Sequence, residues 1–275
     1  MPIDPHSVWS DLQAIKHQSP LIHNITNYVV MEPSANSLLA IGASPVMAHA
    51  IDEVEDMTRA SKALVVNIGT LSPPWVKAME LSIKAAHQHN IPIVFDPVGV
   101  GATPYRTATA ALLLNQAPIT VIRGNTSEIM ALAGSLQPSK GVDSVLETLD
   151  YREQAKSFAL KLKTVIWMSG QTDVITNGHQ TLLVHNGHSL MRKVTGMGCS
   201  ASSLTGAFLA VNKDSLKAAS HAAVTMGVAG ELAARIKEAP GTYRWAFTDT
   251  LYELSLEITV PSTDQSNSAR GTRRA

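Results

Sequence analysis

The chain has 275 residues, of which 45% are apolar and 16% are charged. This composition predicts a globular protein that buries a sizeable core. Lysine plus arginine and aspartate plus glutamate both number 22, so the basic excess that is typical of nucleic-acid-binding proteins is missing. We therefore expect no nucleic-acid partner.

Five short and nearly continuous apolar runs predict the strands of a parallel sheet that is covered on both faces. They are PLIHNIT (20–26), ALVVNIG (63–69), IPIVFDP (91–97), ITVIRGN (119–125) and TVIWMSG (164–170). Helical patterns lie between them at residues 74–89 and 154–162. This alternation predicts an α/β fold, layered α/β/α, with a mostly parallel central sheet.

Residues 173–196 break the alternation, because two strong turn signals, Asn177-Gly178 and Asn186-Gly187, interrupt β-like runs. We expect an antiparallel meander here, with a hairpin at one edge of the sheet. Two apolar, alanine-rich helices should follow at residues 199–211 and 215–236. No repeat or internal linker is evident, so we predict a single domain over residues 1–275, with 261–275 as a flexible polar tail.

No apolar run reaches the roughly 20 residues that span a bilayer, so a membrane partner is not expected. The first residues, MPIDPH, lack the basic and then apolar order of a signal peptide. A single cysteine, Cys199, fits a reducing compartment. We expect a cytoplasmic protein.

Polar residues occur at the ends of most of the predicted strands, where ligands of open α/β sheets bind. Asn27 follows the first strand, Asp96 ends the third, Arg123 lies near the end of the fourth and Ser169 near the end of the fifth. Turns and helix caps use several of the same residue types, so each position alone has an ordinary structural explanation. Their repetition at strand ends indicates a binding site.

Glu128 has two interpretations. It lies in the first turn of a helix after the fourth strand and would serve as an N-terminal capping carboxylate. Together with Asp96 it would also suit a hydrated Mg²⁺, which prefers one or two carboxylates plus waters and phosphates. Arg123, if buried, needs an anionic partner, and a nucleotide phosphate is a natural one.

The segment TGMGCS (195–200) precedes an apolar helix, with Gly196 and Gly198 on either side of Met197 and Cys199 next. A helix start offers free N–H groups and a positive partial charge, so this loop would form an anion hole. An ordinary tight cap with a buried, inert cysteine is the alternative. The fingerprints of P-loop and dinucleotide-binding proteins, of serine hydrolases and of zinc sites are absent from the sequence.

Four stretches resemble the signatures of hydroxyethylthiazole kinases, a branch of the ribokinase-like superfamily. They are PLIHNITNYVVMEPSANSLLAIGASPVMAHA, VFDPVGVGATPYR, VIRGNTSEI and GMGCSASSLTGAF, and the similarity covers residues from about 20 to 258. The resemblance implies a ribokinase-like fold and ATP-dependent phosphorylation of the hydroxyl of 4-methyl-5-(2-hydroxyethyl)thiazole, a salvage step toward thiamine. It also implies ATP as co-substrate, Mg²⁺, and a homotrimer with active sites at subunit interfaces.

Substrate contacts are carried over from the resemblance by motif position. Met47 and Gly196 should contact the thiazole, as should Asn27. Arg123 and Ser169 should contact ATP. The family commonly has threonine where Ser169 stands, so a hydroxyl is retained at this position.

The resemblance also assigns the centre of the reaction. Asp96 and Glu128 match positions associated with the metal and phosphates, and the catalytic loop comprises Gly196, Gly198 and Cys199. Much of the superfamily has an aspartate in place of Cys199 that takes the proton of the attacking hydroxyl. Our hypothesis is that Cys199 positions the hydroxyl and is at best a weak base, since a loose phosphoryl-transfer transition state needs little early proton removal.

Three alternatives remain open at this point. The first keeps the fold and changes the substrate to hydroxymethylpyrimidine or another small alcohol. The second is a thiol-dependent hydrolase or transferase that uses Cys199 as nucleophile, with His23 or His49 as a nearby base. The third is a nucleotide sensor without turnover.

Overall fold

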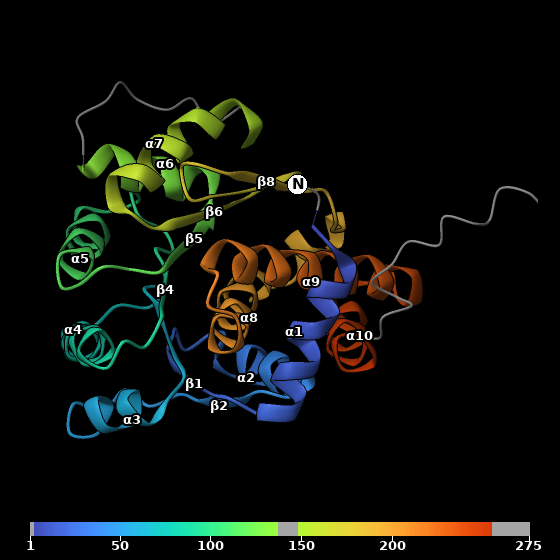
Figure 1. Ribbon diagram of the computed structural model, residues 1–275, viewed down its shortest axis with the longest axis horizontal. Helices are drawn as coiled ribbons and strands as arrows, with labels where there is room; N and C mark the ends of the chain where they lie inside the picture. The colour runs from blue at the N-terminus through green and yellow to red at the C-terminus, as the bar shows by residue number, and fades with distance from the viewer. Residues whose placement is uncertain (1–2, 137–147, 255–275) are drawn as a thin grey trace, which may run out of the picture.

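The computed structural model describes residues 3–136 and 148–254, and its strands form one sheet in the order β2-β1-β3-β4-β5-β6-β7-β8 (Figure 1). The strands are β1 Leu21–Ile25, β2 Ser44–Val46, β3 Ala63–Asn67, β4 Ile93–Asp96, β5 Val121–Asn125, β6 Val165–Ser169, β7 Asp173–Thr176 and β8 Thr181–Val184. The strands from β2 to β6 in this order are parallel to one another, whereas β7 and β8 are antiparallel to their neighbours. The predicted α/β class, mostly parallel sheet and antiparallel edge hairpin are confirmed.

Helices cover both faces of the sheet. They are α1 Pro5–Gln18, α2 Met31–Ala40, α3 Val54–Ala60, α4 Pro73–Gln88, α5 Pro104–Leu114, α6 Thr126–Leu136, α7 Arg152–Leu162, α8 Met197–Val211, α9 Ser215–Ile236 and α10 Pro240–Glu253. Figure 1 shows α3, α4 and α5 on one side of the strands and α1, α8, α9 and α10 on the other. Two apolar clusters fill the space between these helices and the sheet, one on each face. This is the predicted layered α/β/α arrangement.

The central strand β3 shows why its sequence is continuously apolar. Leu64 and Val66 belong to the cluster beneath α4, whereas Val65 belongs to the cluster beneath α8. Alternate side chains of a strand point to opposite faces, so a strand that is covered on both faces needs apolar residues at every position. Gly206 lets α8 lie close to this strand, because a Cβ on it would be 2.8 Å from Val65.

The five predicted strands and four predicted helices are present, with small shifts at their ends. The Asn177-Gly178 turn joins β7 to β8 as expected. No strand follows Asn186-Gly187 in the described part of the chain, where a 3₁₀ helix at Ser189–Lys193 leads back toward α8 instead. Helix α8 begins at Met197, two residues before the predicted start, so Gly198 and Cys199 lie inside its first turn.

The extent of the domain over residues 1–275 stays a prediction, and the tail proposed at 261–275 lies outside the described residues. Among the residues that the structure describes, no helix combines the length and the apolar character needed to cross a membrane.

Candidate active site

The carboxyl ends of the parallel strands meet along one edge of the sheet, the edge where open α/β sheets bind ligands. Read in the spatial order of the strands, the functional candidates at or just beyond these ends are Met47, Asn27, Asn67, Asp96, Arg123 and Ser169. The first two turns of α8 lie over the middle of this row, since Cys199 and Ser202 bond to residues at the ends of β3 and β4. The fold therefore brings these residues together along the carboxyl edge of the sheet.

The thiol of Cys199 lies in a network of neutral amides. Asn67 Nδ2 donates to Sγ at 3.2 Å and Asn27 Nδ2 at 3.6 Å, and Asn27 Nδ2 also donates to Asn67 Oδ1 at 2.9 Å. Burial raises the pKa of the Cys199 thiol to about 12, and the carboxylate of Asp96 acts in the same direction. The cysteine is therefore a protonated thiol at neutral pH and not an activated nucleophile.

Asp96 is buried at the end of β4, with only 1% of its surface exposed. Its Oδ2 accepts from Ser202 Oγ at 2.7 Å and from Asn67 Nδ2 at 2.8 Å, whereas Oδ1 has no hydrogen-bond partner. Burial raises the pKa of Asp96 to about 7, although the nearby positive charge of Arg123 lowers it. A buried oxygen without a partner is costly, so Oδ1 marks a position where a ligand would be favourable.

Glu128 does act as the capping carboxylate of α6. Its Oε2 accepts from the backbone N–H of Asn125, and its own N–H donates to Asn125 Oδ1, both at 2.9 Å, which is a reciprocal capping box. Its other oxygen, Oε1, accepts from the N–H of Gly99 at 2.9 Å. The carboxylate thus ties the loop after β4 to the start of α6, next to Asp96.

Arg123 projects from β5 toward the glycine loop. Its Nη2 donates to Ser169 Oγ at 2.8 Å, and its Nη1 lies so close to Gly198 that a Cβ on this glycine would be 2.6 Å away. Its Nε is buried without a partner, and no carboxylate of the described residues forms an ion pair with it. A half-buried cation without an ion-pair partner, beside a helix N-terminus, is suited to bind an anion.

The glycine loop leaves its N–H groups available for such an anion. Gly196 has a φ of +96°, a left-handed conformation that favours glycine, and no side chain caps the first turn of α8. A cavity of about 1020 Å³ opens next to this turn. Its walls are the β5–α6 junction, the β6–β7 turn, residues 186–192, the start of α8, residues 149 and 151, and the part of α9 that includes Gly227. This volume exceeds that of many small-molecule pockets, so it can hold a ligand of nucleotide size.

Comparison with known proteins identifies the family. The model of the hydroxyethylthiazole kinase family matches residues 12–257. The chain belongs to this family. It is 49% identical over 258 residues to a hydroxyethylthiazole kinase of Syntrophus aciditrophicus, covering 94% of this chain and 96% of the relative.

Solved structures agree with this placement in the hydroxyethylthiazole kinase family. The structure of a hydroxyethylthiazole kinase from Pyrococcus horikoshii OT3 is similar with a TM-score of 0.86 and 39% identity, covering 92% of this chain and 95% of that one. A ribokinase-like superfamily protein from Enterococcus faecalis V583 has a TM-score of 0.59 at 13% identity, covering 85% and 86% of the two chains. The second likeness shows the fold alone.

Three residues of this site were missed at the sequence level. Asn67 ends β3 just as the selected residues end their strands, so the same rule points to it. Ser202 stands three residues after Cys199 on the buried face of α8, a spacing that was available in the sequence. Arg106 binds the carbonyls of Ile68, Val98 and Gly69 at 2.7–2.8 Å and thereby joins the loops after β3 and β4, and only the folded structure reveals this role.

Met47 follows β2 at the outer end of the row, next to a segment that is held from two sides. His23 Nε2 donates to the carbonyl of Ala48 at 2.8 Å, and its Nδ1 lies 2.9 Å from Thr58 Oγ1. His49 stacks on Trp75, with ring centroids 4.4 Å apart. The thiol-nucleophile alternative needs a base at Cys199, but both histidines are engaged elsewhere and the side chains that donate to Sγ in the described residues are amides.

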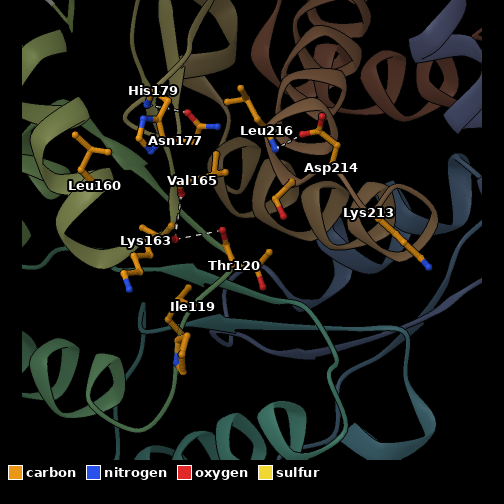
Figure 2. A pocket seen from close by; sticks show the side chains of 13 residues that line it. Ile119, Thr120, Leu160, Lys163, Val165, Asn177, His179, Lys213, Asp214 and Leu216 are labelled. Carbon is orange, nitrogen blue, oxygen red and sulfur yellow. Dashed lines mark hydrogen bonds between the residues drawn. The ribbon is translucent and has the colours of Figure 1, made fainter.

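A second cavity, of about 650 Å³, lies at the opposite edge of the sheet, at the amino ends of β5 and β6 (Figure 2). In Figure 2 the ammonium groups of Lys163 and Lys213 point away from each other. Asp214 is engaged in capping α9, where it accepts from the N–H groups of Leu216 and Lys217. Since these charged groups do not converge, we assign the active site to the carboxyl edge.

Proposed function

We infer that this chain transfers the γ-phosphoryl group of ATP to the hydroxyl of 4-methyl-5-(2-hydroxyethyl)thiazole, a salvage step of thiamine biosynthesis. The family membership supports this reaction. The observation that carries it structurally is a convergence of three features. The unpaired cation Arg123 and the uncapped first turn of α8 line a nucleotide-sized cavity, and the partnerless Oδ1 of Asp96 belongs to the neighbouring strand end.

For ATP, we propose that Arg123 and Ser169 bind the phosphates and hold them against the glycine loop. The N–H groups from Gly196 to Cys199 would stabilise the negative charge of the transferring phosphoryl group, as oxyanion holes do. Gly198 is required because any side chain there would displace the guanidinium of Arg123. The Arg123–Ser169 hydrogen bond, 2.8 Å long, supports this assignment by fixing the guanidinium before the nucleotide binds.

For the alcohol, we propose that Met47, Asn27 and Gly196 contact the thiazole and that the Cys199 thiol orients its hydroxyl. The hydroxyl oxygen forms a bond to the γ-phosphorus while the bond to the β-phosphate oxygen breaks and its electron pair leaves with ADP. A thiol with a pKa of about 12 does not remove the proton at neutral pH. The proton therefore passes late to an oxygen of the transferred phosphoryl group, as a loose transition state allows.

For the metal, we propose Mg²⁺ bound chiefly by the phosphates and water, with Asp96 as the carboxylate ligand. The partnerless Oδ1 of Asp96 fits this role, whereas both oxygens of Glu128 already accept backbone N–H groups. We therefore propose that Glu128 acts on the metal through water and through the loop that it orients. When bound, Mg²⁺ would supply neutralisation of phosphate charge.

We further propose a homotrimer in the cytoplasm with active sites at subunit interfaces. The supporting observation is that Tyr28 and Val29, which directly follow Asn27, are 64% and 63% exposed. Large apolar side chains beside a binding site are favourable when a partner covers them. Light scattering coupled to size exclusion tests the trimer, and Val29→Glu should dissociate it and raise the KM of the alcohol.

The decisive experiment measures ADP release from Mg-ATP with hydroxyethylthiazole, beside hydroxymethylpyrimidine and a reaction without alcohol. ADP formed only with the thiazole is the expected result. ADP formed only with the pyrimidine would redirect the assignment to another small-alcohol kinase. Binding of ATP without ADP release from any alcohol would favour a nucleotide sensor.

A further inference from the structure

One wall of the large cavity is a loop that leaves the sheet after β8 and returns toward α8. Residues of this loop that line the cavity are Asn186, Gly187, His188, Ser189, Met191 and Arg192. The loop has little regular structure apart from its 3₁₀ helix, and it leads within a few residues to Gly196. Its position therefore affects both the shape of the cavity and the approach to the glycine loop.

Glu231, on α9, holds this loop from outside the cavity. Its Oε1 accepts from the backbone N–H of Gly187 at 2.8 Å and from Asn186 Nδ2 at 3.2 Å. Glu231 itself does not line the cavity. Two hydrogen bonds to one carboxylate oxygen fix two consecutive residues of the wall.

Two glycines on the same helix give the loop room to approach. A Cβ on Gly227 would be 2.4 Å from the Cβ of Asn186 and 2.8 Å from its carbonyl oxygen. A Cβ on Gly230 would be 2.6 Å from the sulfur of Met191. The face of α9 formed by residues 227, 230 and 231 is thus shaped for the loop, through two close approaches and one acceptor.

We propose that Glu231 is a positioning residue for the nucleotide: by anchoring Asn186 and Gly187 to α9, it keeps the loop in the conformation that binds ATP. This inference rests on the proposed function, because it takes the large cavity as the nucleotide site. It concerns a residue that contacts the loop and not the substrate. Ordering a mobile wall costs free energy that weakens ligand binding, so a wall that is already ordered in the free protein raises affinity.

The test compares Glu231→Ala with Glu231→Gln. Glutamine retains an Oε1 that can accept both hydrogen bonds, whereas alanine removes the acceptor. We expect Glu231→Ala to weaken the binding of Mg-ADP, measured by calorimetry, by about tenfold, and Glu231→Gln by less than about threefold. In turnover, the KM of ATP should rise in parallel for Glu231→Ala, while kcat and the KM of the alcohol change by less than about threefold.

A second test leaves Glu231 intact and disturbs the loop from Gly227, which itself lines the cavity. Gly227→Ala should also weaken Mg-ADP binding, because the new Cβ meets the backbone of Asn186 and not the end of a flexible side chain. Gly241→Ala is its control, since a Cβ at this position on α10 has nothing within 4 Å. Thermal melting shows whether each variant is folded.

Wild-type affinity for Mg-ADP in a folded Glu231→Ala protein would overturn the inference, as would equal losses in Glu231→Ala and Glu231→Gln. Calorimetry with Mg-ADP needs no alcohol, so it separates this inference from the identity of the acceptor. If the thiazole gives no ADP but the ratio between the two variants holds, the proposed function fails and the anchoring role stands.

Discussion

The proposed alcohol side and the proposed nucleotide side of the candidate active site differ in how their polar groups are satisfied. On the alcohol side, formed by Asn27, Asn67 and Cys199, neutral amides donate to one another and to a thiol. On the nucleotide side, formed by Asp96 and Arg123, two charged side chains each keep a buried atom without a partner.

This difference matches the two substrates proposed here. A neutral alcohol needs orientation, which a network of amides with satisfied hydrogen bonds supplies. A triphosphate with its cation brings charge of its own, and unpaired charged groups are costly in the free protein and favourable only once it binds. The charged groups of the nucleotide side should therefore lower the stability of the free protein while they favour binding of the nucleotide. The amides of the alcohol side should not lower stability.

The largest effect is expected for Asp96→Asn. The variant removes the charge but keeps an acceptor for Ser202 and Asn67, so kcat should fall by about 10²–10³-fold. The pKa of about 7 lies above the ordinary value of 3.8, so this carboxyl's contribution to folding is fully present below pH 3.8 and is lost as the pH rises through 7. Without metal at pH 8, the variant should be more stable than wild type by about 1–3 kcal/mol.

Urea unfolding in a chelating buffer at pH 8 and pH 5 measures this gain, which should be smaller at the lower pH. Ser202→Ala is the control, because it removes one hydrogen bond and leaves the charge in place. A variant that is less stable than wild type at pH 8 would show that the carboxylate is not a cost to the fold.

A smaller effect is expected for Cys199→Ser. Serine keeps an acceptor for Asn67, and a thiol with a pKa of about 12 is not the base, so kcat should fall by less than about tenfold. Loss of a general base would cost about 10²–10⁴-fold with unchanged substrate affinity. Cys199→Asp should remain active, since it restores the residue found in much of the superfamily.

Alkylation gives a second view of the same thiol. Iodoacetamide should label Cys199 slowly at pH 7, because the thiolate is the reactive form and it is scarce far below the pKa. Rapid labelling at neutral pH would support the alternative in which Cys199 is the nucleophile of a hydrolase or transferase.

The residues proposed for the nucleotide side were easier to single out from the sequence than the surroundings of Cys199, for a physical reason. Arg123, Asp96 and Ser169 lie at or near the ends of continuous apolar strands, where a polar residue is conspicuous and the topology fixes its edge. The alcohol side depends on β2, which has three half-buried residues and no recognisable pattern. Its thiol depends on the amide of Asn67, a contact between residues 132 positions apart that only the packing of α8 on the sheet creates.

The same reasoning applies to the elements around the site. Continuous apolar runs predicted β3 to β6, because both faces of these strands are buried. The turn signal at Asn186-Gly187 was misleading, since Glu231 on α9, and not another strand, accepts the hydrogen bonds of these two residues. Local patterns report what a segment buries, but they do not report which distant element accepts its hydrogen bonds.

A further prediction concerns His23, which supports the alcohol side. Ala48 O only accepts, so Nε2 carries the proton, and the neutral Nδ1 lies 2.9 Å from Thr58 Oγ1, whose single proton has both Nδ1 and the carbonyl of Val54 as acceptors. His23→Gln should lower the free energy of unfolding at pH 7.5 by about 1–3 kcal/mol. It should raise the KM of the alcohol more than that of ATP, because the Met47 segment loosens.

The pH dependence of His23 has a definite sign. Burial lowers the pKa of His23 from its ordinary value of 6.5, so the stability that the neutral ring contributes is present above pH 6.5. It is lost as the pH falls through the lowered pKa. Urea unfolding between pH 7.5 and 5 should show a shallower decline in His23→Gln than in wild type, and equal slopes would contradict this account.

The smallest effect is expected at Ser169, which fixes Arg123 through one hydrogen bond. Ser169→Ala should raise the KM of ATP by about three- to tenfold with little change in kcat, because Arg123 keeps its charge but loses its fixed orientation. Ser169→Thr retains the hydroxyl and should match wild type within about twofold. Initial rates at varied ATP measure both variants. If Ser169→Thr lost as much as Ser169→Ala, the hydroxyl would not be the feature that matters, and the orientation of Arg123 would have to depend on its stacking against Trp167, whose ring centroid lies 5.5 Å from the guanidinium carbon.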